Sequence, residues 1–120
     1  MQRVTGIGGF FFRASDPAAL GRWYMNHLGI DPAPIDYSEK PWSQTAGLTV
    51  FAPFPADSDY FGSSKRQWMI NFRVENLDAM VAQLRSAGIE VHVDFEIYSY
   101  GKFARLHDPE GNGIELWEPA

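Results

Sequence analysis

Cysteine is absent from the 120-residue chain. Without a thiol, the chain can form no disulfide framework, thiolate metal site or cysteine nucleophile. Long apolar runs are also missing, because the run from Gly8 to Phe12 stops at Arg13, too short for a signal peptide core or a membrane-spanning helix. We therefore expect a cytoplasmic protein that does not bind a membrane.

Positive charge is scarce as well. Ten Lys and Arg stand against fifteen Asp and Glu, a net charge of -5, which argues against binding to nucleic acid or to an anionic membrane surface. The length of 120 residues and the 45% hydrophobic content are typical of one globular domain. Aromatic residues make up 15% of the chain, a share that favours a ligand pocket beside the core.

The first half of the chain predicts a strand, a helix and further strands. Aromatic and β-branched residues are dense from Val4 to Ala14, as in a strand. Asp16 and Pro17 suit the cap and first position of a helix that ends at Gly29. Between Ile30 and Phe54, prolines separate short mixed segments, and we expect up to three short strands there.

The second half predicts the same order of elements. Trp68 to Val74 alternates as a strand, and Asn76 can cap a helix from Leu77 to Ala87, whose apolar residues follow helical spacing. From Ile89 to Tyr98 apolar and polar residues alternate, which predicts a strand with one face in water. Two more strands flank a turn from Asp108 to Asn112.

Three matches in the same order relate the two halves to each other. They pair Phe12-Arg13 with Phe72-Arg73, Leu28-Gly29-Ile30-Asp31 with Ala87-Gly88-Ile89-Glu90, and Gly47 to Pro53 with Gly113 to Pro119, at offsets of 60, 59 and 66. The matches predict a single domain, 1–120, built of two βαβββ repeats, about 1–54 and 67–120, joined by 55–66. We expect an α+β fold in which the two modules lie side by side and form a curved mixed sheet around a cup.

These motifs resemble the vicinal oxygen chelate superfamily, which includes glyoxalase I, bleomycin-resistance proteins and extradiol dioxygenases, and in particular its small members. The resemblance rests on Arg13 to Pro17 with the helix that follows, on Asn71 to Val74, and on Tyr100 to Pro119. Its most specific part is the Asp-Pro-Glu-Gly-Asn turn followed by Ile-Glu-Leu. The resemblance implies paired βαβββ modules, often a homodimer, and in the metalloenzymes a divalent metal held by His, Gln or Glu.

The metal positions that the resemblance implies fall on Gly9, Thr49, Met69 and Glu115. Only Glu115 keeps a good ligand for a hard metal, because glycine has no side chain and a thioether is a poor donor to such ions. We therefore expect no cofactor. A divalent metal held by Glu115 together with His107 is the alternative.

Strand alternation predicts which side chains face the cup. The candidates for ligand binding are Phe11, Arg13, Met69, Asn71, Arg73, Glu115 and Trp117, while Phe10, Phe12, Ile70, Phe72, Val74, Ile114 and Leu116 face the helices. Arg13 and Arg73 occupy equivalent repeat positions, where they either grip a ligand carboxylate or phosphate or pair with Glu115. The aromatic residues Trp42, Tyr60, Phe61, Trp68, Tyr98 and Tyr100 either line the mouth of the cup or belong to the core.

The leading functional prediction is metal-independent binding of a small, anionic, partly aromatic molecule in the cup. No catalytic residue is assigned, and Glu115 is the candidate for a general base. One alternative is a metal-dependent lyase or dioxygenase that uses Glu115 with other ligands. A second is a dimer that sequesters a drug, as bleomycin-resistance proteins do.

Overall fold

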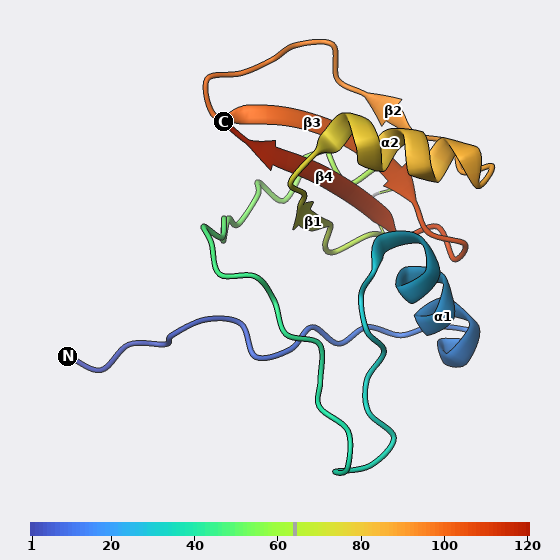
Figure 1. Ribbon diagram of the computed structural model, residues 1–120. Helices are drawn as coiled ribbons and strands as arrows, with labels where there is room; N and C mark the ends of the chain where they lie inside the picture. Colours follow the sequence, from blue (N-terminus) through green and yellow to red (C-terminus); the bar gives the residue numbers. More distant parts are fainter. Residues whose placement is uncertain (64) are drawn as a thin grey trace.

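The computed structural model describes residues 1–63 and 65–120 and has an α+β fold, as predicted. In chain order its elements are α1 (Pro17–Leu28), β1 (Ile70–Arg73), α2 (Leu77–Ser86), β2 (His92–Val93), β3 (Gly101–His107) and β4 (Gly113–Pro119). The strands form one open sheet in the order β1-β4-β3-β2 (Figure 1). Because β1 runs parallel to β4 and the other neighbours are antiparallel, the sheet is mixed.

Both helices begin after their predicted capping residues, and α1 ends before Gly29 as predicted, whereas α2 ends at Ser86, one residue before the predicted Ala87. Asp16 accepts the backbone N–H of Ala19 at the start of α1, and Gly29 ends that helix with a left-handed φ of 70°. Asn76 accepts the backbone N–H of Ala79 in the same way at the start of α2. No helix in 1–63 or 65–120 is long and apolar enough to cross a membrane.

The core lies between the helices and one face of the sheet. Helix α2 lies across that face, while α1 packs at the end of the sheet (Figure 1). The most deeply buried side chains of this core are Leu77, Leu84, Leu106, Ile114 and Leu116. The predicted alternation is confirmed in the second half, since Ile70, Phe72, Ile114 and Leu116 all belong to this core.

A buried turn joins α1 to the strands that carry the site. Asp108 accepts hydrogen bonds from the Tyr24 hydroxyl (2.7 Å), from the Asn112 amide (2.7 Å) and from the backbone N–H groups of Glu110 (2.9 Å) and Asn112 (3.0 Å). Burial, followed by this hydrogen bond to Asp108, raises the pKa of Tyr24 well above its ordinary value, so the hydroxyl stays a donor. The turn motif therefore fixes both α1 and the start of β4.

The strand predicted from Ile89 to Tyr98 is much shorter in the structure. Only His92–Val93 forms a strand paired with β3. Asp94 adds one further backbone bond to Phe103, and Tyr98 forms an isolated bridge with Gly101. The Asp94 carboxylate then accepts the backbone N–H of Glu96 and the hydroxyl of Tyr98, each at 3.0 Å. Such local side-chain bonds compete with strand pairing, and they turn the chain away from the sheet.

The strands predicted in the first repeat are absent from the described residues. Segments 1–14 and 30–54 contain no strand, whereas the second repeat has the full βαβββ order. A strand needs a hydrogen-bonded partner, and these segments run away from the sheet instead (Figure 1). The radius of gyration of 15.3 Å accordingly exceeds the value of about 14 Å typical of a compact domain of this length. The cup of two modules stays a prediction.

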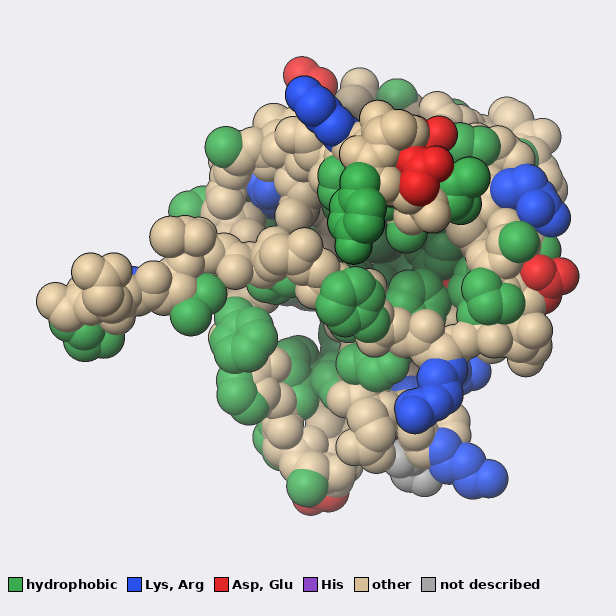
Figure 2. Space-filling model, turned by 90° about the horizontal axis from the view of Figure 1, so that it is seen from below, with side chains coloured by type: hydrophobic (Ala, Val, Ile, Leu, Met, Phe, Trp, Pro, Cys, Tyr) green, Lys and Arg blue, Asp and Glu red, His purple; other side chains and the backbone are tan. Residues whose placement is uncertain are grey.

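The first repeat exposes apolar side chains to water. Figure 2 shows hydrophobic side chains gathered around an open hollow, with the N-terminal segment standing out as an arm. The most exposed large apolar residues of these segments are Met1, Val4, Phe11, Ile35, Tyr37, Leu48, Val50 and Phe51. Exposed apolar patches of this extent are typical of surfaces that contact another molecule.

Candidate functional site

A row of three polar side chains crosses the face of the sheet that points away from the core. Asn71 on β1 is in register with Glu115 on β4, and Glu115 is in register with Arg105 on β3. The neighbours of these residues along each strand belong to the core, so alternation turns all three toward the open face. The row is therefore fixed by rigid strands.

Glu115 lies at the centre of the row and is almost fully buried, with 8% of the residue exposed. One carboxylate oxygen, Oε1, accepts a hydrogen bond from the Asn71 amide at 2.8 Å. The other, Oε2, accepts a hydrogen bond from the Tyr60 hydroxyl. Two neutral donors thus satisfy the carboxylate, and no ion pair holds it among the described residues.

Tyr60 reaches this site from the segment that joins the two repeats. Burial is the largest cause of its perturbation, and the hydrogen bond to Glu115 adds to it, so that the pKa of Tyr60 rises to about 12. The hydroxyl therefore stays protonated and donates to the carboxylate at neutral pH. The sequence indicated an aromatic residue near the cup here but gave no sign of its partner.

Arg105, like Tyr60, was not among the predicted ligand-binding positions. Its guanidinium carbon lies 4.4 Å from the centre of the Tyr60 ring, and its Nη2 donates to the Tyr60 carbonyl oxygen at 2.5 Å. The same nitrogen lies 3.7 Å from the sulfur of Met69. Alternation along β3 could have identified Arg105, because it faces the same side of the sheet as Phe103.

An aromatic group lies on the same face, one step along the strands from the row. The rings of Phe103 and Trp117, cross-strand neighbours on β3 and β4, are nearly parallel, with centroids 6.3 Å apart and an interplanar angle of 6°. The indole N–H of Trp117 donates to the carbonyl oxygen of Tyr100 at 2.9 Å. Trp117 is only 8% exposed, and the rings of Tyr98 and Tyr100 contact Phe103 edge-on. A flat ring system can therefore pack against the half-buried Phe103 and the exposed Tyr100.

The structure brings together only part of the predicted ligand-binding set. Met69, Asn71, Glu115 and Trp117 lie at or beside the row. Arg73 is in register with Trp117, and its Nη2 donates to the carbonyl oxygen of Thr45 at 2.9 Å.

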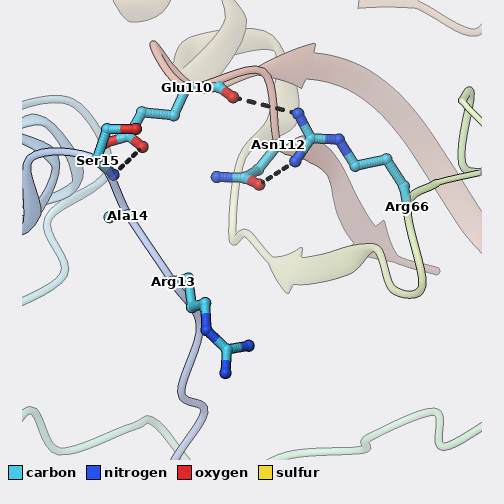
Figure 3. Close-up of a pocket in the computed structure, with 6 residues that line it drawn as sticks. All are labelled: Arg13, Ala14, Ser15, Arg66, Glu110 and Asn112. Atoms are coloured by element: carbon cyan, nitrogen blue, oxygen red, sulfur yellow. Dashed lines mark hydrogen bonds between the residues drawn. The ribbon is translucent and has the colours of Figure 1, made fainter.

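The remaining two candidates, Phe11 and Arg13, lie in the first repeat, away from the row. Phe11 is 94% exposed. Arg13 lines a shallow surface pocket of about 350 Å³ together with Ser15, Arg66, Glu110 and Asn112, and its guanidinium points away from Glu110 (Figure 3). Arg66 donates there to the amide oxygen of Asn112 at 2.8 Å and to the carbonyl oxygen of Glu110 at 3.2 Å. The Arg13–Arg73 pair expected at one cavity is therefore not assembled within the single chain.

The implied metal positions do not form a set that fits a divalent ion. Gly9 and Thr49 are exposed and lie outside any strand, while the sulfur of Met69 faces the cation of Arg105. Glu115 alone supplies a hard oxygen, and both of its oxygens already accept hydrogen bonds. Within residues 1–63 and 65–120, no three His, Asp or Glu side chains cluster as metal ligands would.

The histidine considered as a further ligand lies elsewhere. His107 lines a surface pocket of about 130 Å³ with Ile89, Glu90 and His92. The His92 ring lies 3.1 Å from Glu90, with which it can pair when protonated. The structure thus groups His107 with these residues of the β2 region, and no contact joins it to Glu115 among the described residues.

Comparison with known proteins places the chain in a structural context. A family model described as a glyoxalase-like domain matches residues 9–117. The crystal structure of TnmS3, an antibiotic-binding protein from Streptomyces sp. CB03234, covers 100% of both chains at 22% identity and a TM-score of 0.64. At that identity the likeness concerns the fold alone. No curated protein matches the chain.

Two further solved structures match only about half of the chain. A glyoxalase family protein from Bacillus anthracis is 30% identical over 52% of this chain and 50% of its own, with a TM-score of 0.41. A glyoxalase/bleomycin resistance protein from Streptomyces sp. CB03234 is 27% identical over 51% of this chain and 54% of its own, with a TM-score of 0.38.

Proposed function

We propose that this chain, which belongs to the glyoxalase-like domain family of the vicinal oxygen chelate superfamily, binds a small, anionic, partly aromatic molecule on the open face of its sheet without a metal. The observation that carries the proposal is a pair of arginines on that face, Arg73 and Arg105, that form no ion pair with an acidic side chain of the described residues. The aromatic group of Phe103 and Trp117 lies on the same face and supplies the apolar part of the site.

The absence of ion pairs at the two arginines, among the described residues, supports an anionic ligand. Within the described part of the chain, ion pairs join Glu90 to His92 and join Lys102 to Asp78 and Glu118, and none involves either arginine. Arg73 donates to a backbone carbonyl only, and Glu115 is satisfied by neutral donors. Asp94, whose charge also acts on Tyr60, accepts only neutral donors as well. Neither guanidinium is therefore used in an ion pair, and each can bind a ligand carboxylate or phosphate in forked geometry.

The donor set supports binding without a metal. A divalent ion beside Glu115 would have to displace the hydroxyl of Tyr60 or the amide of Asn71 and would lie close to the Arg105 cation. If the protein also catalyses a reaction, Glu115 is the residue placed to act as a general base. A metal-dependent lyase or dioxygenase would instead bind a transition metal that survives dialysis, which elemental analysis detects.

The proposal is tested with 2-naphthoate and its neutral analogue 2-naphthalenemethanol. We expect calorimetric binding of the naphthoate to the wild type, and about tenfold weaker binding to Arg73→Ala, because a hydrogen bond to a charged group is lost. Arg22→Ala removes an exposed arginine of α1 and serves as the control that leaves affinity unchanged. Equal binding of the neutral analogue, or none of either compound, would contradict the proposal.

A role in antibiotic sequestration is the second candidate function. The observation that favours it is the aromatic group of Phe103, Trp117 and Tyr100, whose exposed part offers a stacking surface for a flat drug. TnmS3, which shares the fold over the whole chain, is an antibiotic-binding protein. Protection of a sensitive bacterial strain by expression of this chain, lost in Trp117→Ala, would support sequestration.

We also infer that the first repeat completes the cup together with a second copy of the chain. Exposed apolar residues such as Phe11 and Phe51 leave water only when another surface covers them. β1 is an edge strand whose outer side has no partner among the described residues, and an open edge accepts a further strand. A second copy carries the same segments and the same edge, so each copy can cover the other in a homodimer.

An engineered disulfide tests this inference. Asn71 and Glu115 are in register, and their repeat equivalents are Phe11 and Thr49. The chain has no native cysteine, so the double variant Phe11→Cys, Thr49→Cys forms an unambiguous bond. We expect a covalent dimer on a non-reducing gel. A disulfide within one chain would show that a single copy forms the module, and no disulfide would refute the module itself.

A further inference from the structure

The Tyr60 ring occupies a position on the open sheet face that strand residues build. Arg105 and Glu115 are direct cross-strand neighbours of opposite charge, a pairing that normally forms an ion pair. They form none within the described chain; instead both contact the phenol of Tyr60. The guanidinium lies over the ring and the carboxylate accepts its hydroxyl, so the two strands together make a seat for one hydroxylated aromatic ring.

Tyr60 itself belongs to a less constrained part of the molecule. Residues 53–63 contain no helix or strand. Tyr60 stacks on Phe54, with ring centroids 5.6 Å apart, and Phe54 is itself largely exposed. The turn around it is closed by backbone bonds from Ser58 N–H to the Pro55 carbonyl oxygen and from Gly62 N–H to the Asp59 carbonyl oxygen. The Tyr60 backbone also donates to the Ser58 hydroxyl and accepts from Arg105. The seat is thus rigid while its occupant is held by a loop, and the occupant is the easier part to move.

The chemistry of the seat selects its ligand. A carboxylate oxygen needs a donor, so a ligand carboxylate cannot replace the hydroxyl of Tyr60 at Glu115. A cationic ring would be repelled by the guanidinium of Arg105, whereas the face of a neutral aromatic ring attracts it. A neutral ring with a hydroxyl group satisfies both contacts.

We propose that Tyr60 is a built-in occupant of a hydroxyaryl seat, and that the natural ligand carries a hydroxylated aromatic ring that displaces it. The inference rests on the proposed function, which it deepens by naming the ligand class. Displacement means that the ligand competes with Tyr60. The apparent association constant is therefore the intrinsic association constant multiplied by the fraction of molecules whose seat is empty.

The test compares 6-hydroxy-2-naphthoate with 2-naphthoate, which differ by one hydroxyl group. We expect the hydroxylated compound to bind the wild type about tenfold more tightly, because it replaces the charge-assisted bond that Tyr60 gives up. Tyr60→Phe weakens the built-in occupant and should raise the affinity of the hydroxylated compound by about tenfold as well. Tyr37→Phe, which removes a hydroxyl from a fully exposed tyrosine, is the matched control and should change nothing.

Two further variants separate the seat from a general effect on the fold. Glu115→Gln replaces the charged acceptor with a neutral one and should reduce the preference for the hydroxylated compound several-fold. Tyr60→Ala empties the seat and should bind p-cresol more tightly than toluene, as the rise in melting temperature reports.

The outcomes distinguish this inference from the proposed function. If 2-naphthoate binds and depends on Arg73 but the hydroxyl adds no affinity, or if Tyr60→Phe leaves both affinities unchanged, the hydroxyaryl seat is refuted and the anion site stands. If neither naphthoate binds the wild type, the proposed function itself fails.

Discussion

Replacement of Asp108 by alanine should destabilise the protein severely, although this residue touches no ligand. Asp108 is 95% buried, as its exposed fraction of 5% shows, and it accepts four hydrogen bonds, two from side chains and two from the backbone. The side-chain donors are the hydroxyl of Tyr24 on α1 and the amide of Asn112 in the turn. Removal of the carboxylate therefore leaves both donors without an acceptor inside the protein.

The magnitude follows from the two side-chain donors. Each buried donor left without a partner costs about 1–3 kcal/mol, so the pair lowers the free energy of unfolding by about 2–6 kcal/mol. A domain of this size has a total stability of about 5–15 kcal/mol. The variant should therefore lose a large part of its stability, because it breaks one of two links between α1 and the turn. The other link, the Glu110 carboxylate that accepts the backbone N–H groups of Ser15 and Asp16, remains in the variant.

Urea denaturation followed by tryptophan fluorescence and by circular dichroism measures this loss. Asp31→Ala, which removes an exposed carboxylate just beyond α1, is the control and should stay within about 0.5 kcal/mol of the wild type. A loss below about 1 kcal/mol in Asp108→Ala would refute the reasoning, because it would mean that the turn does not need its buried acceptor.

Two other changes should act on the strands that carry the site. The pKa of Tyr60 is raised to about 12 by burial and by the hydrogen bond to Glu115, above its unfolded value of about 10. Its contribution to stability is therefore complete below about pH 10 and lost as the pH rises toward about 12. In an alkaline unfolding titration Tyr60→Phe should lose less stability over this range than the wild type, and the remaining loss includes that of Tyr98, whose pKa also rises to about 12. Gly101→Ala places a methyl group at a φ of 134°, against the carbonyl oxygen of Glu118 and the indole nitrogen of Trp117. Thermal unfolding should report a loss of at least about 1–3 kcal/mol in the free energy of unfolding. An unchanged melting temperature would show that β3 can shift there.

The sequence predicted those features that depend on local chemistry. Both helices follow from a capping residue, Asp16 or Asn76, and from apolar residues at helical spacing. The facing of β1 and β4 follows from alternation, which correctly placed Asn71 and Glu115 on the open face. These features need no knowledge of the partner segment, because each is encoded within about ten residues.

Features that depend on partners far apart in the sequence could not be predicted from the sequence. The aromatic, β-branched composition of 4–14 shows a preference for strand structure but does not identify a neighbouring strand, and no described residue of the single chain pairs with this segment as a strand. The contact between Tyr60 and Glu115 joins residues 55 positions apart, and no sequence pattern in 55–66 predicts it. The alternation of β3 could have predicted that Arg105 faces the open side of the sheet. Its contact with the Tyr60 ring, however, is known only from the structure.

The measurement that tests the central claim most directly is a titration of ¹⁵N-labelled protein with 6-hydroxy-2-naphthoate. The chain has four tryptophans, so Trp117→Phe assigns the indole signal of the open face. We predict that the largest shifts fall on that indole and on the amides of β1, β3 and β4. Shifts that instead gather at the surface pocket of Arg13 and Arg66 (Figure 3), or no shifts at all, would contradict a ligand site on the open face of the sheet.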